Sequence, residues 1–486
     1  MFLYEKIIKF FNFEKKVNYM FDFFKIKLTP KISLRSTINV AMKKIIYVIN
    51  DPSTPELIKE LMPPLYSEKP YLNVKGYKGG GFSRSSVEGQ AANCYVTVTN
   101  TIKLVNSTSQ IKITNWPGTS TLQIIPRAGV DLNAFYDRRS LKFFFVNDPR
   151  VGGSLYTCDS ADIVAHELGH AILDAFRPET WSAISLEVAS MHEAFGDFIA
   201  IMHALSYEEI VNYVINETQG NLRKNNVVSE LAEQFGVAVY KLSNPKDGRS
   251  PSSLRSAIND FKYVNPGTLP IDAPYNQLAA ECHSFGRVFL GALYDMLVMI
   301  YEDVKQSGKS PVDSLIEART TLLRYMLKTI QNAPLNVKFF NSISKTILWA
   351  DVTLNNRKYH DRIYEILKNR NLITTQLMML SAPKCENDNL IIKTQSCMNI
   401  KLEDKVMRNQ SDDNPLYGVE LEIPTESVYL YDKNRNLYDC LIVSEDESLS
   451  AAIDMIKYLH VTNSVSNDSK TPFEIKDGKL VRTHFS

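Results

Sequence analysis

Cysteine is scarce in this sequence and widely spaced. Six cysteines stand in a chain of 486 residues, without the paired spacing of a thiolate metal site or the density of a disulfide scaffold. They are Cys94, Cys158, Cys282, Cys385, Cys397 and Cys440. The sequence therefore predicts mostly free thiols.

The sequence also lacks a charge excess, a long apolar run and a recognisable signal peptide. Its 55 basic and 54 acidic residues give a net charge of +1, which offers no electrostatic footprint for nucleic acid. The longest helical apolar stretch, 288–300, is interrupted by Asp295 and is too short to cross a bilayer. Residues 1–27 mix Phe and Ile with Lys and Glu. We therefore expect no transmembrane segment and a cytoplasmic location, with secretion by an unrecognised signal as the alternative.

The pattern along the chain predicts an α+β fold of two or three domains. Residues 1–45 are read as an N-terminal extension, and residues 46–160, with strand-like runs and turn signals, as a β-rich lobe. Residues 161–375 have helical periodicity, and residues 376–486 read as a small α+β accessory domain.

Individual elements are also predicted. Strands are expected at 45–49, 141–146, 389–393 and 418–422, helices at 229–242, 314–331 and 449–458, and a strand pair across 476–479.

The segment His166-Glu167-Leu168-Gly169-His170 is the most informative motif. Flanking apolar residues at three- and four-residue spacing predict a buried helix. Histidines at i and i+4 share one helix face, so both can reach one Zn²⁺ through neutral ring nitrogens. Glu167 is offset from the two ligands and suits a general base better than a ligand. The motif predicts one catalytic zinc site.

A catalytic zinc needs a third protein ligand, and Glu193 is the best candidate. It lies in a second predicted buried helix, antiparallel to the first, where Asp197 stands one turn later on the same face. Asp197 is placed to accept a hydrogen bond from a zinc histidine. The neighbouring His192 diverges by about 100° and is expected to pack elsewhere.

Three further segments occur in order around these motifs: Asn133-Ala134-Phe135-Tyr136, Ser253-Leu254-Arg255-Ser256 and Cys282-His283-Ser284-Phe285-Gly286. Together with His-Glu-Leu-Gly-His and Glu-Ala-Phe-Gly-Asp at residues 193–197, they resemble the thermolysin-like gluzincin metallopeptidases over residues 90–375. The resemblance implies a two-lobed fold with the zinc site in the cleft between a β-rich N-terminal lobe and a mainly helical lobe. It also implies a zinc-dependent endopeptidase whose partner is an extended peptide or protein substrate.

The resemblance assigns further roles. It implies that Asn133 and Ala134 lie on an edge strand that binds the substrate backbone, that Arg255 binds a substrate carbonyl, and that His283 stabilises the transition state. Trp181 stands where the family carries a tyrosine that donates to the oxyanion, and its indole N–H can also donate.

The chain departs from the family pattern at two other places. Leu278 replaces the aspartate that orients the transition-state histidine, which leaves Glu281 or Asp272 as substitutes. Asp162 matches a family calcium-site position, but Ala204 stands where a second acidic residue is expected. Calcium is therefore not predicted.

Two alternatives to an endopeptidase remain open. One is a catalytically weak relative whose cleft binds peptides and whose C-terminal domain provides a docking surface, although Glu167 argues against it, because a binding protein needs no base. The other is an aminopeptidase of the wider gluzincin group, for which no amine-anchoring motif is evident near residue 133.

Overall fold

A computed structural model describes residues 44–79, 83–242, 252–373, 390–393, 397–401, 416, 418–461, 465 and 471–485. Within these ranges the protein is a mixed α+β structure with several small sheets. Most of the expected N-terminal extension, residues 1–43, lies outside the described residues, as do Gly80, Gly81 and residues 374–389.

The N-terminal part contains a mixed four-stranded sheet in the order β3-β4-β6-β5. Its strands are β3 (Tyr71–Val74), β4 (Thr121–Ile125), β6 (Ser140–Phe143) and β5 (Ala134–Tyr136). The first three are parallel, and β5 pairs antiparallel with β6 through Phe135 opposite Lys142. The strand β5 is therefore an edge strand, as the sequence predicts.

Two hairpins flank this sheet. They are β1 (Ile45–Val48) with β2 (Ile58–Leu61), and β7 (Phe145–Asp148) with β8 (Gly153–Tyr156). The predicted strand 141–146 is two strands in the structure, because Phe144 separates β6 from β7. Short 3₁₀ turns are η1 (Pro55–Leu57), η2 (Pro149–Val151), η3 (Thr157–Asp159), η4 (Pro178–Thr180) and η6 (Pro266–Thr268).

The long helix α3 (Val87–Thr108) lies within the region 46–160, for which the sequence predicts a β-rich lobe without indicating this helix. It connects the parallel strands β3 and β4, which need a crossover because a tight turn cannot join parallel strands. The helix is rich in Val and Thr, is buried on most faces and begins at Ser86, whose side chain accepts from the Gly89 N–H. Because β-branched residues favour strands, residue propensities did not predict this helix.

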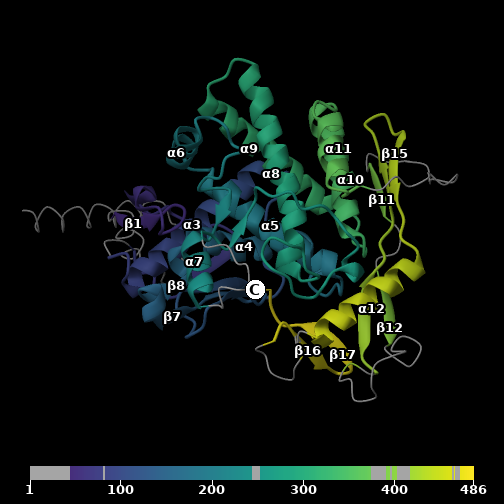
Figure 1. Cartoon of the computed structure of the whole chain (residues 1–486), viewed down its shortest axis with the longest axis horizontal. Coiled ribbons are helices and arrows are strands. Elements are labelled where there is room, and N and C mark those ends of the chain that lie inside the picture. Colours follow the sequence, from purple (N-terminus) through teal and green to yellow (C-terminus); the bar gives the residue numbers. More distant parts are fainter. Residues whose placement is uncertain are drawn as a thin grey trace, which may run out of the picture.

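Three buried helices form the centre of the molecule (Figure 1). The helix α4 (Ala161–Phe176) packs against α5 (Leu186–Ala204), and α5 packs against α8 (Cys282–Gln306). The surrounding helices are α6 (Glu208–Thr218), α7 (Glu233–Leu242), α9 (Pro311–Asn332), α10 (Phe339–Asn355) and α11 (His360–Asn369). The helix predicted at 314–331 is confirmed as part of α9.

The prediction for residues 229–242 is only partly right. Residues Glu230–Leu231 form the short strand β9, which pairs with β10 (Arg255–Ser256), and the helix α7 begins at Glu233. A single amphipathic pattern therefore spans a strand and a helix.

The helix α8 is longer than the apolar stretch expected from the sequence. Among the described residues it is the one helix whose length and composition would suffice to cross a membrane, but 89% of its apolar window is buried inside the protein.

The described residues of the C-terminal part form two small sheets and one helix. One sheet has the order β11-β14-β15, with β11 (Ile391–Lys393), β14 (Val428–Tyr431) and β15 (Leu437–Leu441). The other has the order β12-β13-β17-β16, with β12 (Cys397–Lys401), β13 (Glu420–Pro424), β17 (Lys479–Arg482) and β16 (Phe473–Lys476). The helix α12 (Glu445–Val461) and the β16–β17 hairpin are at the predicted places.

Candidate metal centre

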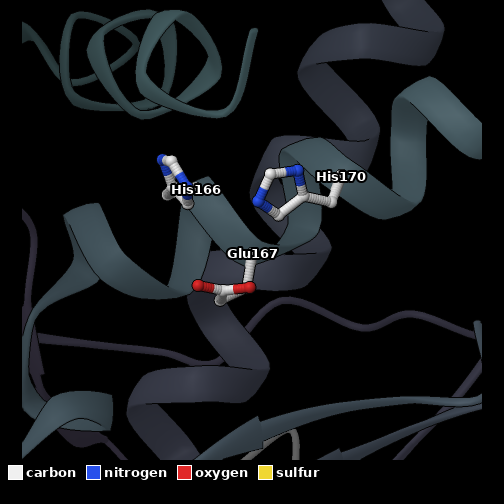
Figure 2. Close-up of side chains that lie close together, drawn as sticks. All are labelled: His166, Glu167 and His170. Carbon is white, nitrogen blue, oxygen red and sulfur yellow. The ribbon is translucent and has the colours of Figure 1, made fainter. Parts of the chain in front are cut away.

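The helix α4 brings two imidazoles and a carboxylate together in a buried position. Ligand atoms of His166, Glu167 and His170 lie within 4.8 Å of one another. Figure 2 shows these three side chains on neighbouring turns of the helix. This buried group could hold a metal ion.

The helix α5 places the carboxylate of Glu193 beside both imidazoles. Its Oε2 lies 3.3 Å from Nε2 of His166, and its Oε1 lies 3.7 Å from Nε2 of His170. His166, which comes first on α4, also meets Asp197, one turn after Glu193 on α5, whereas the later His170 meets Glu193. The helices therefore run antiparallel, as predicted.

The donor atoms at this place fit a metal ion. Neither ring nitrogen of His170 and neither oxygen of Glu193 has a hydrogen-bond partner, although both side chains are buried. The Nε2 atoms of His166 and His170 lie close to the Glu193 carboxylate, but these contacts do not have hydrogen-bond geometry. Unpartnered buried polar atoms are costly, and imidazole nitrogen with carboxylate oxygen is a donor set that zinc accepts.

A second group of possible ligand atoms, Glu193, Cys282 and His283, overlaps the first at Glu193. Nε2 of His283 lies 3.2 Å from Oε2 of Glu193, and its Nδ1 lies 2.6 Å from Oε1 of Glu281. Burial alone would lower the pKa of His283, but the charges of Glu193 and Glu281 and the contact with Cys282 raise it well above the usual value. Glu193 is thus shared between this group and the two histidines of α4.

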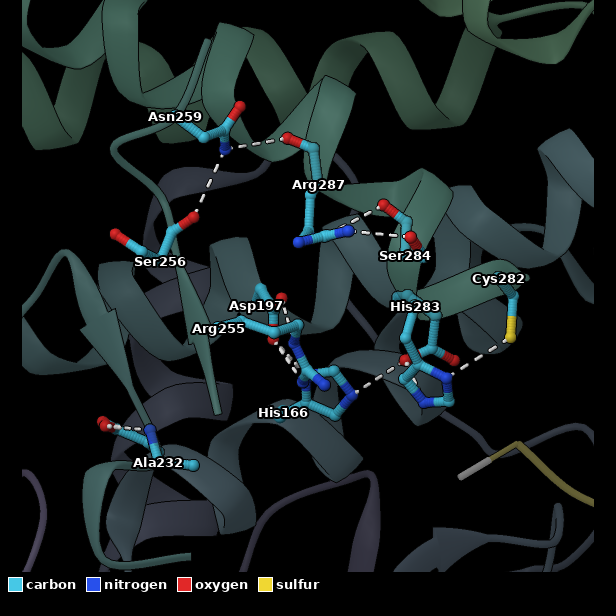
Figure 3. A network of polar contacts seen from close by, with 12 residues as sticks. His166, Asp197, Ala232, Arg255, Ser256, Asn259, Cys282, His283, Ser284 and Arg287 are labelled. Atoms are coloured by element: carbon cyan, nitrogen blue, oxygen red, sulfur yellow. Dashed lines mark hydrogen bonds and ion pairs between the residues drawn. The ribbon is translucent and has the colours of Figure 1, made fainter. Parts of the chain in front are cut away.

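Asp197 fixes the orientation of His166. Its Oδ1 lies 2.8 Å from Nδ1 of His166, and Nε and Nη2 of Arg255 donate to its carboxylate at 2.7 and 2.8 Å (Figure 3). Burial alone would raise the pKa of Asp197, but Arg255 and His166 hold it well below its usual range. Burial alone would lower the pKa of His166, but Asp197 and Glu193 raise it to about 9. The ionised Asp197 thus directs the Nδ1 proton towards itself and leaves Nε2 facing Glu193.

Two glycines allow α4 and α5 to approach this closely. A Cβ at Gly169 would lie 2.7 Å from the Cα of Gly196, and a Cβ at Gly196 would lie 2.8 Å from the ring of His166. A third glycine, Gly286, allows α8 to approach α5 closely, because a Cβ there would lie 2.8 Å from the Ser190 carbonyl oxygen. These contacts hold His166, Glu193 and His283 near one another, because any side chain there would push the helices apart.

Glu167 is buried next to this group and faces the adjoining cavity. Burial raises the pKa of Glu167 to about 8, and the charge of Glu193 adds to the effect although His166 and His283 oppose it. Its Oε2 has no hydrogen-bond partner. The carboxyl group is therefore suited to exchange a proton near neutral pH.

A cavity of about 920 Å³ opens onto the site. Its lining includes every residue to which the sequence assigns a catalytic or substrate role except Trp181, namely Asn133, Ala134, Glu167, Arg255 and His283. The edge strand β5 thus borders the same cavity as α4, which carries His166, and α8, which carries His283. A volume of this size accommodates a peptide segment of a few residues.

The partner of His283 is Glu281, one of the two candidates from the sequence. Glu281 precedes α8, and its carboxylate accepts from the backbone N–H groups of His283 and Ser284 as well as contacting the imidazole. One residue therefore caps the helix and orients the histidine. Asp272, the other candidate, lines the cavity.

The short strand that carries Arg255 is tied to α8. Nδ2 of Asn259 donates to the carbonyl oxygens of Ser256 and Arg287 (Figure 3). The Arg287 guanidinium donates to carbonyls of the cavity-lining loop at Tyr275 and Gln277. Arg255 is therefore held in place through its neighbour Ser256, and its guanidinium binds the carboxylate of Asp197. The sequence did not predict this contact with Asp197.

Trp181 lies elsewhere than expected. It is buried beneath the edge strand, where its ring meets Tyr136 edge-on at 5.7 Å and Phe485 at 5.5 Å. The indole is not among the residues that line the cavity. Its position supports the packing of β5 rather than a contact with the reacting groups.

The structure also shows residues near the site that sequence reasoning missed. The ring of Phe485 stacks on His192 at 3.9 Å and on His170 at 5.3 Å between centroids. His192 packs beside the metal-binding group without joining it: its ring lies 5.7 Å from that of His170 between centroids, and its Nε2 contacts Oγ1 of Thr180. No spacing pattern relates Phe485 to residues about three hundred positions earlier, so local sequence carried no signal for this contact.

A second buried acidic group surrounds Asp162. Carboxylate oxygens of Asp51, Asp162 and Glu233 lie within 4.8 Å of one another, and Oδ2 of Asp51 has no hydrogen-bond partner. Burial, aided by the neighbouring carboxylates, raises the pKa of Glu233 to about 10. The family pattern places a second acidic residue at position 204, where this chain has Ala204, whereas in the structure the acidic neighbours of Asp162 are Asp51, after β1, and Glu233, at the start of α7.

Comparisons with known proteins add no family to these findings. No protein-family model matches the chain, and no curated protein matches it.

Proposed function

We propose that this protein is a zinc-dependent endopeptidase of the thermolysin-like gluzincin kind. One observation carries the proposal: the carboxylate of Glu193 comes from a different helix and lies, without a hydrogen-bond partner, beside the nitrogens of His166 and His170. In this proposal His166, His170 and Glu193 hold one zinc ion, a set of three protein ligands typical of catalytic zinc.

Bound zinc would supply Lewis-acid polarisation of a carbonyl group and a lowered pKa for a water molecule. The chain itself supplies the orientation of the ligands. Asp197 accepts from Nδ1 of His166 and is in turn held by Arg255, so the imidazole presents Nε2 in one fixed direction.

Glu167 is the general base in this proposal. Its carboxylate takes a proton from the attacking water and later passes it to the nitrogen of the departing amine. The raised pKa of about 8 supports this role, because a group that first accepts and then donates a proton works best when its pKa is near the working pH.

His283 and the edge strand act on the substrate. Glu193 and Glu281 hold His283 in its protonated form at the cavity wall, where it can donate to the oxygen of the tetrahedral intermediate. A donor of this kind is commonly worth about 2.7–4 kcal/mol. The open edge of β5 at Ala134, with Asn133 beside it at the cavity wall, suits an extended peptide backbone, which would add a strand to the sheet.

The test is cleavage of a mixed peptide pool by the zinc-loaded protein and by its Glu167→Gln variant, followed by mass spectrometry. We expect internal peptide bonds to be cut, and the variant to lose about 10²–10⁴-fold in rate while keeping its zinc. Glu365→Gln, at an exposed position of α11, is the matched control. Equal rates for Glu167→Gln and the parent would contradict the proposal, as would an inactive parent that contains zinc.

A further inference from the structure

The last described residues of the chain leave the C-terminal sheet and reach the centre of the molecule. The strand β17 ends at Arg482, and the chain then runs towards the middle of the molecule, where C marks its end (Figure 1). There Phe485 forms a bridge with Tyr136 of the edge strand β5. Arg482, His484 and Phe485 are all buried there. We call residues Arg482–Phe485 the C-terminal segment.

The C-terminal segment pairs with β5 as an added antiparallel strand. The N–H of Tyr136 donates to the carbonyl of Phe485 at 2.9 Å, and the N–H of Phe485 donates to the carbonyl of Tyr136 at 2.9 Å. This contact lies on the side of β5 opposite β6. Both backbone groups that Tyr136 offers to an incoming peptide are therefore occupied.

The side chain of Phe485 fills a subsite made by aromatic rings. It stacks on His192 at 3.9 Å and on His170 at 5.3 Å, and Trp181 meets it edge-on at 5.5 Å. The ring is only 3% exposed. A site of this shape suits a flat aromatic side chain, because two imidazoles stack against it and the indole meets it edge-on.

Two neighbouring residues hold the segment in place. Nε of Arg482 donates to the carbonyl of Trp181 at 3.2 Å, and its guanidinium lies 4.0 Å from the centroid of Phe485. The ring of His484 lies on the other side of β5, 4.6 Å from Phe135. His484 and Phe485 thus contact opposite faces of the sheet.

The direction of the segment leads towards the cavity. Because the pairing is antiparallel, the chain at Phe485 runs from Tyr136 towards Ala134 and Asn133, which line the cavity beside Glu167. Residue alternation places Ala134 on the same open edge as Tyr136. The segment therefore approaches the candidate centre in the way an extended peptide on β5 would.

We propose that the edge of β5, with the subsite formed by His170, Trp181 and His192, is a binding site for extended peptides that place an aromatic residue opposite Tyr136, and that the C-terminal segment occupies it as an internal ligand. This inference rests on the proposed function and specifies its substrate: peptides with an aromatic side chain at that position. In this proposal the C-terminal domain also has a function, because the segment follows β17 directly and is placed at the site by it. Peptides gain access only when the segment is displaced.

The test measures binding separately from catalysis. In the zinc-loaded Glu167→Gln background, a chain ending at Arg482 is compared with the full chain for binding of a fluorescein-labelled Leu-Val-Arg-Thr-His-Phe peptide, by fluorescence anisotropy. We expect the shortened chain to bind the peptide at least tenfold more tightly than the full chain. A peptide with Ala in place of Phe should lose at least tenfold of that affinity.

Two further variants control this experiment. Phe485→Ala in the full chain keeps the backbone length and should also bind the peptide more tightly than its parent, which decides the matter should the shortened chain fail to fold. Lys479→Ala, at an exposed position of β17, should leave binding unchanged.

Each outcome is decisive. Equal affinity of the full chain, the shortened chain and Phe485→Ala, or no binding by a folded shortened chain, overturns the inference. Cleavage of the mixed peptide pool is then measured in the same chains with Glu167 restored, because the labelled peptide ends opposite Tyr136 and does not extend along β5 to the cavity. Tight binding without cleavage refutes the peptidase and leaves the binding site standing, whereas cleavage at equal rates by all chains refutes the internal ligand alone.

Discussion

At the scale of single residues, the site depends on a series of charged contacts that runs from Arg255 through Asp197 to the imidazole of His166. Arg255 keeps Asp197 ionised, Asp197 orients His166, and Gly196 leaves room for the ring because a Cβ there would lie 2.8 Å from it. The role of Asp197 follows from its spacing after Glu193. The role of Gly196 does not, because only the distance between two helices shows that a methyl group would not fit.

A buried histidine outside the site gives a prediction about pH. His203 lies between the hydroxyl groups of Tyr47 and Thr101, and burial lowers its pKa to about 3. The folded state therefore resists protonation, and its stability, full above about pH 6.5, falls as the pH drops towards 3. In that range His203→Gln should reduce the pH slope of the unfolding free energy by about 1.4 kcal/mol per pH unit.

Urea denaturation of the parent and of His203→Gln at steps between pH 4 and pH 8 checks this. The two curves should run parallel above pH 7, where His203 is neutral in both the folded and the unfolded chain. Parallel curves below pH 6 as well would show that His203 does not contribute to the acid sensitivity.

Residues whose partners are near in sequence were the easier ones to predict. Glu281 is two positions from His283, and the sequence offered it as a candidate partner. Trp181 was assigned by its distance from His170 along the chain, yet it packs under β5, because the turn at η4 directs its ring towards Tyr136. The number of residues between two positions limits how far apart they can lie, but it does not determine the direction in which a side chain points.

At the scale of elements, the centre is built from an antiparallel helix pair and one edge strand. Asp174 near the end of α4 joins them: it is fully buried, and it accepts from the Tyr136 hydroxyl at 2.8 Å and from Nη2 of Arg138 at 2.8 Å. This network fixes the distance between the strand that borders the cavity and the helix that carries His166 and His170.

Asp174→Ala should therefore lower the free energy of unfolding by about 1–3 kcal/mol, because the buried Tyr136 hydroxyl loses its partner. Arg138 is about one third exposed and can turn to solvent, which limits the loss. Glu365→Ala removes an exposed ion pair with Lys368 and should cost less than about 1 kcal/mol. Urea denaturation of both variants measures the difference, and equal losses would refute the role of Asp174.

Helices with an amphipathic or strongly apolar pattern could be predicted, and α4, α5 and α9 were. The helix α3 could not, since it is buried on most faces and carries Val and Thr where a strand would carry them. The strand β9 was hidden for another reason: it spans only Glu230–Leu231 and is defined by its pairing with β10, which is distant in sequence.

At the scale of the whole molecule, the C-terminal part is packed onto the helical part rather than joined to it by a linker alone. Ile184 and Val337 belong to the apolar core of the C-terminal part, and Trp349 donates through Nε1 to the carbonyl of Tyr431 at 2.8 Å. Lys345 is buried and pairs with Asp439 at 3.1 Å. The sequence placed the boundary near residue 375 but gave no sign of these contacts.

A chain ending at residue 375 should consequently be much less stable than the full chain. Each of the three apolar side chains is worth about 1.5–3 kcal/mol when buried, and Lys345 would lose its partner. Thermal unfolding followed by circular dichroism should show a lower melting temperature, with binding of an apolar dye at 25 °C. An unchanged melting temperature would mean that the two parts fold independently.

The central claim is that His166, His170 and Glu193 converge on one zinc ion. The most direct measurement is the zinc content of the purified full chain and of Glu193→Ala after dialysis, with the X-ray absorption spectrum of the bound metal. We predict one zinc per chain, two imidazole nitrogens at about 2.0–2.1 Å, and at least a hundredfold weaker binding in the variant. A chain that binds no zinc, or binds it equally well without the Glu193 carboxylate, would contradict this account.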